Sequence, residues 1–162
     1  MKLNRLYFFV SMFLLCATMV NAQDKNVNNV LTAYFTLKND LVADNAATAK
    51  THATELAAAI KAVPADKIPA EQLATWKKIQ VSTSKITEAK DIDTQRDYFA
   101  ILSDNMIAVT KALKFNTVPV YQQYCPMKKV NWLSEAAAIK NPFYGKQMPT
   151  CGQVTETLAA VK

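Results

Sequence analysis

The sequence predicts an all-α fold, an antiparallel bundle of about four helices that carries an irregular C-terminal coat. Three observations support this prediction. Apolar residues recur at intervals of three and four from Val27 to Leu113, a spacing typical of amphipathic helices. No stretch before residue 117 alternates apolar and polar residues as a half-buried strand would. Both glycines and four of the six prolines lie between residues 119 and 152, where they interrupt any helical pattern.

Two helices are expected before residue 64. The first carries an apolar stripe of Val27, Val30, Leu31, Tyr34, Phe35, Leu41 and Val42. We expect Asp44 to cap the second helix, which extends from Asn45 to roughly Val63. The predicted buried face of this helix consists of Ala49, Ala53, Leu56 and Ile60.

Two more helices follow a turn that Pro64 and Pro69 bracket. Proline suits the first position of a helix, so Pro69 is expected to begin the third helix. This helix is predicted to continue through Leu73, Trp76, Ile79, Thr83 and Ile86. Asp91 or Asp93 is expected to cap the fourth helix, which carries Phe99, Leu102, Met106, Val109 and Leu113.

The segment 116–152 is predicted to be an ordered, irregular coat that packs its aromatic residues against the bundle. Val118–Tyr124 could form a short extended piece, and Ser134–Ile139 about one and a half helical turns. A last helix is expected over Val154–Val161. Trp132 is expected to anchor the coat, and the Arg96 guanidinium to tie it to the bundle through carbonyls or a carboxylate.

The first 22 residues resemble a secretory signal peptide. Lys2 and Arg5 precede the apolar run Leu6–Val20, and Val20-Asn21-Ala22 is a small-residue cleavage site. The run is short for a membrane span. We therefore expect residues 23–162 to form one domain, periplasmic or secreted, with no membrane span after cleavage.

Charge and motifs exclude several classes of function. Without Lys2 and Arg5, 17 of the 19 basic residues remain against 13 acidic ones, a net charge of +4 with no basic stripe. Nucleic acid is therefore not an expected partner. The chain has no glycine-rich phosphate loop, no paired-carboxylate motif and no Cys-x-x-Cys motif, so we do not expect an enzyme.

The strongest functional signal is a methionine near each exported cysteine, in Cys125-Pro126-Met127 and Met148-Pro149-Thr150-Cys151-Gly152. Thiolates and thioethers are soft ligands that favour Cu(I). Cys125, Met127, Met148 and Cys151 are therefore candidate metal ligands. His52, the only histidine, is a further candidate. A Cys125–Cys151 disulfide without metal is the alternative, because exported cysteines commonly pair.

Several segments together resemble a known family. They are Cys125-Pro126-Met127, Trp132-Leu133-Ser134, Asn141-Pro142-Phe143-Tyr144-Gly145 and Met148-Pro149-Thr150-Cys151-Gly152, with Arg96, Phe99, Leu102 and Ser103 upstream. This string resembles the uncharacterised bacterial domain of unknown function three-three-four-seven, whose members resemble small exported proteins or the tail of CusB-like membrane-fusion subunits of heavy-metal efflux pumps. The resemblance implies a soft metal, with a heavy-metal efflux system or a copper chaperone as partner.

Two hypotheses follow for function. The first is an exported module that binds a soft metal, expected to be Cu(I), in metal handling or efflux. The second is a disulfide-stabilised structural or interaction module without metal. In either case Arg96, Trp132, Asn141, Gly145 and Gly152 are expected to have structural roles.

Overall fold

The computed structural model describes residues 20–161. The expected signal peptide, residues 1–22, lies outside this part except for its last three residues, which begin the first described helix. None of the helices in the described part is both long and apolar enough to cross a membrane.

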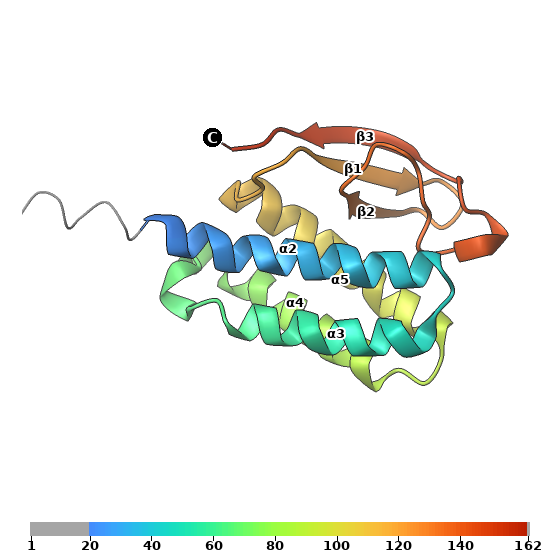
Figure 1. Ribbon diagram of the computed structural model, residues 1–162, viewed down its shortest axis with the longest axis horizontal. Helices are drawn as coiled ribbons and strands as arrows, with labels where there is room; N and C mark the ends of the chain where they lie inside the picture. Colours follow the sequence, from blue (N-terminus) through green and yellow to red (C-terminus); the bar gives the residue numbers. More distant parts are fainter. Residues whose placement is uncertain (1–19, 162) are drawn as a thin grey trace, which may run out of the picture.

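Four helices make up the first two thirds of the fold, α2 (Val20–Val42), α3 (Ala46–Lys61), α4 (Leu73–Glu88) and α5 (Ile92–Leu113). Each helix packs on the next one in the chain, α2 on α3, α3 on α4 and α4 on α5. Figure 1 shows α2 and α5 between the layer of α3 and α4 and a small sheet. Short turns connect α2 to α3 and α4 to α5, as expected for antiparallel neighbours.

The four helices predicted between residues 27 and 113 are confirmed as α2, α3, α4 and α5. The predicted inner face of α3, Ala49, Ala53, Leu56 and Ile60, is the buried face in the structure. Asp91 caps α5 by accepting a hydrogen bond from the Thr94 amide at 2.7 Å. Met106, on the inner face of α5, is fully buried in the core.

Two predicted helix starts are wrong. Asn45, not Asp44, caps α3 and accepts a hydrogen bond from the Thr48 amide at 3.2 Å. Asp44 is in the left-handed region at φ 58°, and its carboxylate contacts Arg96 instead. Pro69 precedes a 3-10 turn, η2 (Ala70–Gln72), and α4 begins only at Leu73.

The prediction of an all-α fold is wrong after residue 119. Three strands, β1 (Val120–Cys125), β2 (Val130–Ser134) and β3 (Gln153–Leu158), form an antiparallel sheet in the order β2-β1-β3. The expected extended piece 118–124 largely coincides with β1. The predicted last helix is wrong, because residues 153–158 pair with β1 as β3. Val154, Thr155 and Thr157 are β-branched and favour an extended backbone over a helix.

The predicted turns of helix over Ser134–Ile139 are also wrong. Ser134 ends β2, and the chain then bends across the sheet. The buried side-chain amide of Gln123 in β1 donates a hydrogen bond to the carbonyl of Ala136 at 2.9 Å. The carbonyls of Ala137 and Ala138 lie 3.3 Å from the same nitrogen. These carbonyls therefore satisfy a buried polar group of the sheet.

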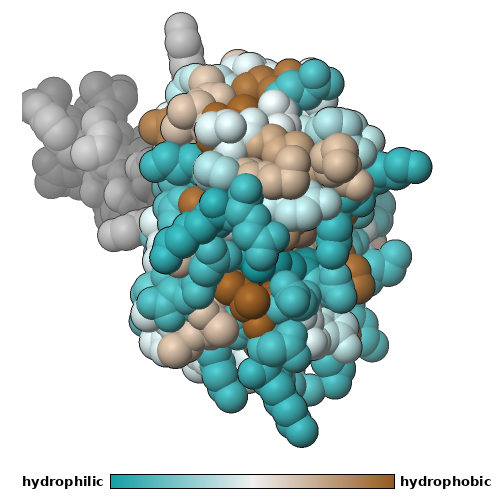
Figure 2. Space-filling view, turned by 90° about the vertical axis from the view of Figure 1, so that its right-hand side faces the viewer, coloured by the Kyte–Doolittle hydropathy of each residue, from teal (hydrophilic) through white to brown (hydrophobic). Residues whose placement is uncertain are grey.

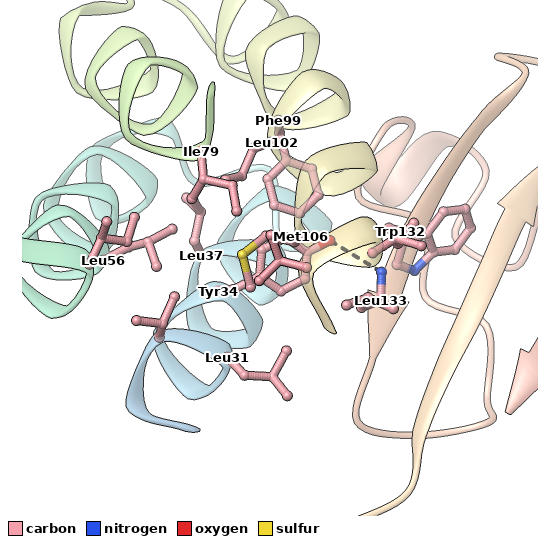
Figure 3. Packing of buried hydrophobic residues seen from close by; sticks show 14 of the residues in the cluster. Leu31, Tyr34, Leu37, Leu56, Ile79, Phe99, Leu102, Met106, Trp132 and Leu133 are labelled. Carbon is pink, nitrogen blue, oxygen red and sulfur yellow. Dashed lines mark hydrogen bonds between the residues drawn. The ribbon is translucent and has the colours of Figure 1, made fainter. Parts of the chain in front are cut away.

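An aromatic series joins the bundle to the sheet. Tyr34 stacks on Phe99 with ring centroids 5.2 Å apart, Phe99 contacts Phe143 at 5.8 Å, and Phe143 contacts Trp132 at 5.9 Å. The Tyr34 hydroxyl also accepts a hydrogen bond from the Leu133 amide of β2 at 3.2 Å, drawn in Figure 3. The sheet is therefore part of the same core as the helices.

This core predicts a sharp contrast between two neighbouring residues of α5. Leu102 is fully buried, so Leu102→Ala should lower the free energy of unfolding by about 2 to 4 kcal/mol through the cavity it leaves. Ile101 is 50% exposed, and Ile101→Ala should change it by no more than about 0.5 kcal/mol. Urea denaturation measures both values. Equal effects of the two substitutions would contradict the assignment of the buried face of α5.

Candidate functional site

The site begins at the end of β1, where the hairpin to β2 holds Cys125. Cys125 is fully buried and pairs with Val130 across the hairpin. Its carbonyl accepts a hydrogen bond from the Lys129 amide at 2.8 Å, and Lys129 closes the turn in the left-handed region at φ 59°. The four turn residues, 126–129, are exposed. The sulfur of Cys125 therefore sits on a fixed backbone just below the surface.

Asn141 positions the second cysteine. It is fully buried, and its side-chain amide donates to the Cys151 carbonyl at 2.6 Å. Its backbone amide donates to the Pro149 carbonyl at 2.9 Å, and its side-chain oxygen accepts from the Phe143 amide at 2.8 Å. One side chain and its backbone thus close the loop that returns the chain to the sheet beside Cys125.

Gly152 lets this loop approach the sheet closely. A Cβ atom here would lie 2.9 Å from the Trp132 ring and 3.0 Å from the Tyr124 carbonyl, and Gly152 has a φ of 150°. Both the backbone conformation and the space exclude larger residues. Trp132, fully buried in β2, therefore forms the wall against which the Cys151 turn rests.

The two cysteine sulfurs lie 3.6 Å apart. This separation is too long for a disulfide bond, which measures about 2.05 Å. It is close to the separation of about 3.8 Å expected for two thiolates that bind one ion tetrahedrally at about 2.3 Å each. Cys125 is buried, whereas Cys151 is partly exposed. The arrangement can hold one ion from the surface side, or close to a disulfide after a small movement.

The two thiols differ in their proton affinity. Burial would raise the pKa of Cys125, but hydrogen bonds from the Lys128 amide, the Asn141 side chain and Cys151 together lower it below its usual value. The hydrogen bond to Cys125 raises the pKa of Cys151, and burial and the charge on Cys125 add to this effect. The contact between the two sulfurs therefore favours a shared proton, with Cys125 as the better acceptor of the pair.

The two methionines of the motif lie at the same end of the molecule. Met127, in the hairpin turn, is 65% exposed and Met148 is 38% exposed. The Met148 carbonyl accepts a hydrogen bond from the Cys151 amide at 3.2 Å, so these residues share one turn. This end also carries η3 (Gly145–Gln147) and faces the viewer in Figure 2, where apolar areas lie between hydrophilic residues. Neither thioether is taken up by the core.

His52 is placed elsewhere. It lies on α3, which packs on the side of α2 away from the sheet, and its Nδ1 contacts the Asp40 carboxylate. The hydrogen bond to Asp40 raises the pKa of His52. Within residues 20–161, no three side chains of His, Cys, Asp or Glu come close enough to share a metal ion. The structure therefore does not bring His52 to the cysteine pair.

Arg96 connects the loop of Cys151 to the bundle. Its Nε donates to the Pro142 carbonyl at 2.8 Å, and one terminal nitrogen donates to the Leu41 carbonyl at 3.0 Å and to the Asp44 carboxylate. The other oxygen of Asp44 accepts from the Lys146 amide at 2.9 Å. Gly145 adjoins this junction, where a Cβ atom would collide with Asp44 and Arg96.

A buried lysine on α2 is a structural contact that sequence reasoning missed. Lys38 is 1% exposed and donates to the Glu135 carboxylate at 2.8 Å and to the Ser134 hydroxyl at 3.3 Å, at the end of β2. Burial lowers the pKa of Lys38, although the hydrogen bond to Glu135 opposes this. A signal was present, because Lys38 falls four residues after Tyr34 and three before Leu41 on the buried stripe of α2.

Comparison with known proteins assigns the helical part of the chain to a family. The family described as "Protein of unknown function (DUF3347)" matches residues 30–117, more than half of the chain. The chain therefore belongs to this family. The match covers most of α2 and all of α3, α4 and α5, and ends before β1 and the two cysteine segments. No curated protein and no solved structure matches the chain.

The Arg96 junction predicts a dependence of stability on pH. The Lys146 amide and then Arg96 hold the pKa of Asp44 below its usual value. A lowered folded-state pKa stabilises the fold above the unfolded value of about 3.9, and this contribution is lost as the pH falls through the folded-state pKa. Asp44→Asn keeps a residue that tolerates the left-handed backbone, and at neutral pH it should cost about 1 kcal/mol after allowance for solvent screening.

Urea denaturation at several pH values measures this effect. The difference between the wild-type protein and Asp44→Asn should shrink as the solution becomes acidic. Asp93→Asn is the matched control, because Asp93 lies 3.5 Å from Arg96 but its side chain is 89% exposed, so it should have little effect. A difference for Asp44→Asn that stays constant down to strongly acidic pH would contradict the role of its charge.

Proposed function

We propose that this member of the DUF3347 family binds a soft metal ion, Cu(I) in particular, between Cys125 and Cys151. The observation that supports the proposal is the contact of the two sulfurs at 3.6 Å, with one cysteine buried and the other partly exposed. A thiolate is the form of cysteine that binds metals, and the lowered pKa of Cys125 favours it.

The donor set favours Cu(I) over Zn²⁺. Structural zinc sites take four ligands, mostly Cys and His, and the described residues offer only two such side chains at this place. Cu(I) is selected by thiolate and thioether sulfur, and the exposed Met127 and Met148 can complete a sulfur-only site from the surface. Lys128 and Lys129 follow Met127 in the hairpin turn and would add positive charge to this part of the chain, although the Lys128 ammonium contacts Asp97 at 3.4 Å.

The site lies near the surface, which suits a protein that exchanges its metal ion with a partner better than one that stores the ion in a buried site. The hairpin turn between β1 and β2 and the helical turn η3 lie at one end of the molecule (Figure 1). The first carries the exposed Met127, and the second precedes the exposed Met148 and the partly exposed Cys151, so another protein with sulfur ligands could approach there. We therefore infer a role in metal handling after export, with a heavy-metal efflux system or a copper chaperone as partner. The efflux partner rests on the family resemblance of the cysteine segments.

The alternative is a disulfide that stabilises the loop without any metal. The short distance between the sulfurs favours this candidate as well. However, Asn141, Arg96 and the Asp44–Lys146 contact already hold the loop through hydrogen bonds. A disulfide has no use for the two exposed thioethers, so the metal site explains more of the motif.

The thiols are tested by anaerobic titration of the reduced protein with Cu(I) in competition with a coloured chelator. The wild-type protein should take Cu(I) from the chelator, and Cys125→Ser and Cys151→Ser should each lose most of this ability because a hydroxyl is a hard ligand. Retention of full affinity in the variant that lacks both cysteines would contradict the proposal. Circular dichroism controls for unfolding.

The thioethers are tested by the double substitution Met127→Leu and Met148→Leu. Leucine keeps the apolar volume, so the free energy of unfolding should change by less than about 1.5 kcal/mol per site. The affinity for Cu(I) should fall, and the affinity for Zn²⁺ should change less. Met106→Leu is the matched control, because this methionine is fully buried on α5 and should leave Cu(I) affinity unchanged.

An unchanged Cu(I) affinity in the double variant would contradict the role of the thioethers. This result would also favour the alternative, in which the two cysteines form a structural disulfide. Metal binding by the reduced protein would then be adventitious binding to free thiols.

A further inference from the structure

The two cysteines differ in how external reagents can reach them. Cys125 is fully buried beneath the hairpin turn, whereas Cys151 lies in the exposed turn that precedes β3 and is partly accessible. Their sulfurs are nevertheless in contact at 3.6 Å. A reagent from solution therefore meets Cys151 first, and among residues 20–161 Cys125 is the one other cysteine, positioned to react with whatever forms there.

The fold does not depend on a bond between these sulfurs. The loop from Asn141 to Cys151 is closed by the two hydrogen bonds of Asn141, to the carbonyls of Cys151 and Pro149. Arg96 separately holds the Pro142 carbonyl. The loop can therefore keep its place both with and without a disulfide, which is a requirement for a bond that forms and breaks repeatedly.

We propose that Cys125 and Cys151 form a reversible disulfide that exchanges with external thiols and disulfides through Cys151. The co-reactant is an organic disulfide or thiol, either a small molecule or the exposed cysteine of another protein. Accessible disulfides are the labile ones that serve regulation, whereas structural disulfides resist reduction.

The steps balance as follows for a disulfide RSSR. The Cys151 thiol first passes its proton to the Cys125 thiolate with which it is in contact. The thiolate of Cys151 then attacks one sulfur of RSSR, the S–S bond of RSSR breaks, and RS⁻ leaves. Cys125 then attacks the sulfur of Cys151, which forms the Cys125–Cys151 bond and expels a second RS⁻. Two protein thiols are oxidised, RSSR is reduced to two RSH, and the two protons of the protein thiols pass to the released thiolates. Reduction is the reverse, with RS⁻ attacking Cys151.

The consequence for metal binding rests on the proposed function. A sulfur in a disulfide is no longer a thiolate, so the oxidised pair cannot hold Cu(I) as two thiolates do. Oxidation would release the ion at the exposed end of the molecule, and reduction would restore the site. The chemistry of the pair itself does not require the metal and can be tested without it.

The test treats reduced, metal-free protein with oxidised glutathione in the presence of a chelator, and follows intact mass and thiol content. The wild-type protein, prepared without the expected signal peptide and hence without Cys16, should lose both thiols and end without a glutathione adduct, and reduced glutathione should return both thiols. In Cys125→Ser the adduct on Cys151 should persist, because no second thiol expels the glutathione. Cys125→Ala repeats this measurement without a buried hydroxyl.

Cys151→Ser isolates the role of burial. Its remaining thiol, Cys125, should react at least about tenfold more slowly than Cys151 does in Cys125→Ser, and should react readily once the protein is unfolded in denaturant. The proposal is overturned if folded Cys151→Ser reacts as fast as Cys125→Ser. It is also overturned if the wild-type protein stops at a glutathione adduct, or if its disulfide resists reduced glutathione. A failure to bind Cu(I) leaves all these outcomes unchanged, so the two proposals fail separately.

Discussion

The guanidinium of Arg96 joins α5 to two parts of the chain that are far from it in the sequence, the end of α2 with its following turn and the C-terminal loop. From α5 it reaches the end of α2 through the Leu41 carbonyl, the α2–α3 turn through Asp44, and the C-terminal loop through the Pro142 carbonyl. A buried guanidinium is stable only when its donors are satisfied, so these contacts must form together. The helical bundle and the cysteine loop consequently fold as one unit, and the position of Cys151 depends on the bundle.

Local contacts in the small sheet and its loop also limit the conformational freedom of the two cysteine sulfurs. Cys125 is fixed by its strand, and Cys151 by the hydrogen bonds of Asn141 and by the close approach of Gly152 to Trp132. Pre-organised ligands bind an ion without first paying the entropy of ordering a loop. The exposed side of the pair remains open to exchange, which a metal hand-off and a thiol exchange both require.

The helices could be predicted from the sequence because their apolar spacing is local, as the buried face of α3 shows. The pairing of β3 with β1 could not be predicted in this way. This pairing depends on the free edge of a strand about thirty residues earlier in the chain, and not on a local pattern. At the site, the composition of the motif pointed to both cysteines. The sequence did not reveal that Asp44 binds Arg96 instead of capping α3, because an aspartate at this position is compatible with either role.

X-ray absorption spectroscopy of the protein loaded with one equivalent of Cu(I) tests the central claim most directly, because it counts the atoms bound to copper. A site built on Cys125 and Cys151 predicts a first shell of sulfur alone, at least two atoms per copper. Loss of the sulfur shell in Cys151→Ser would agree with this assignment. A first shell of nitrogen or oxygen, as His52 or surface carboxylates would give, would contradict the claim that the sulfur pair is the metal site.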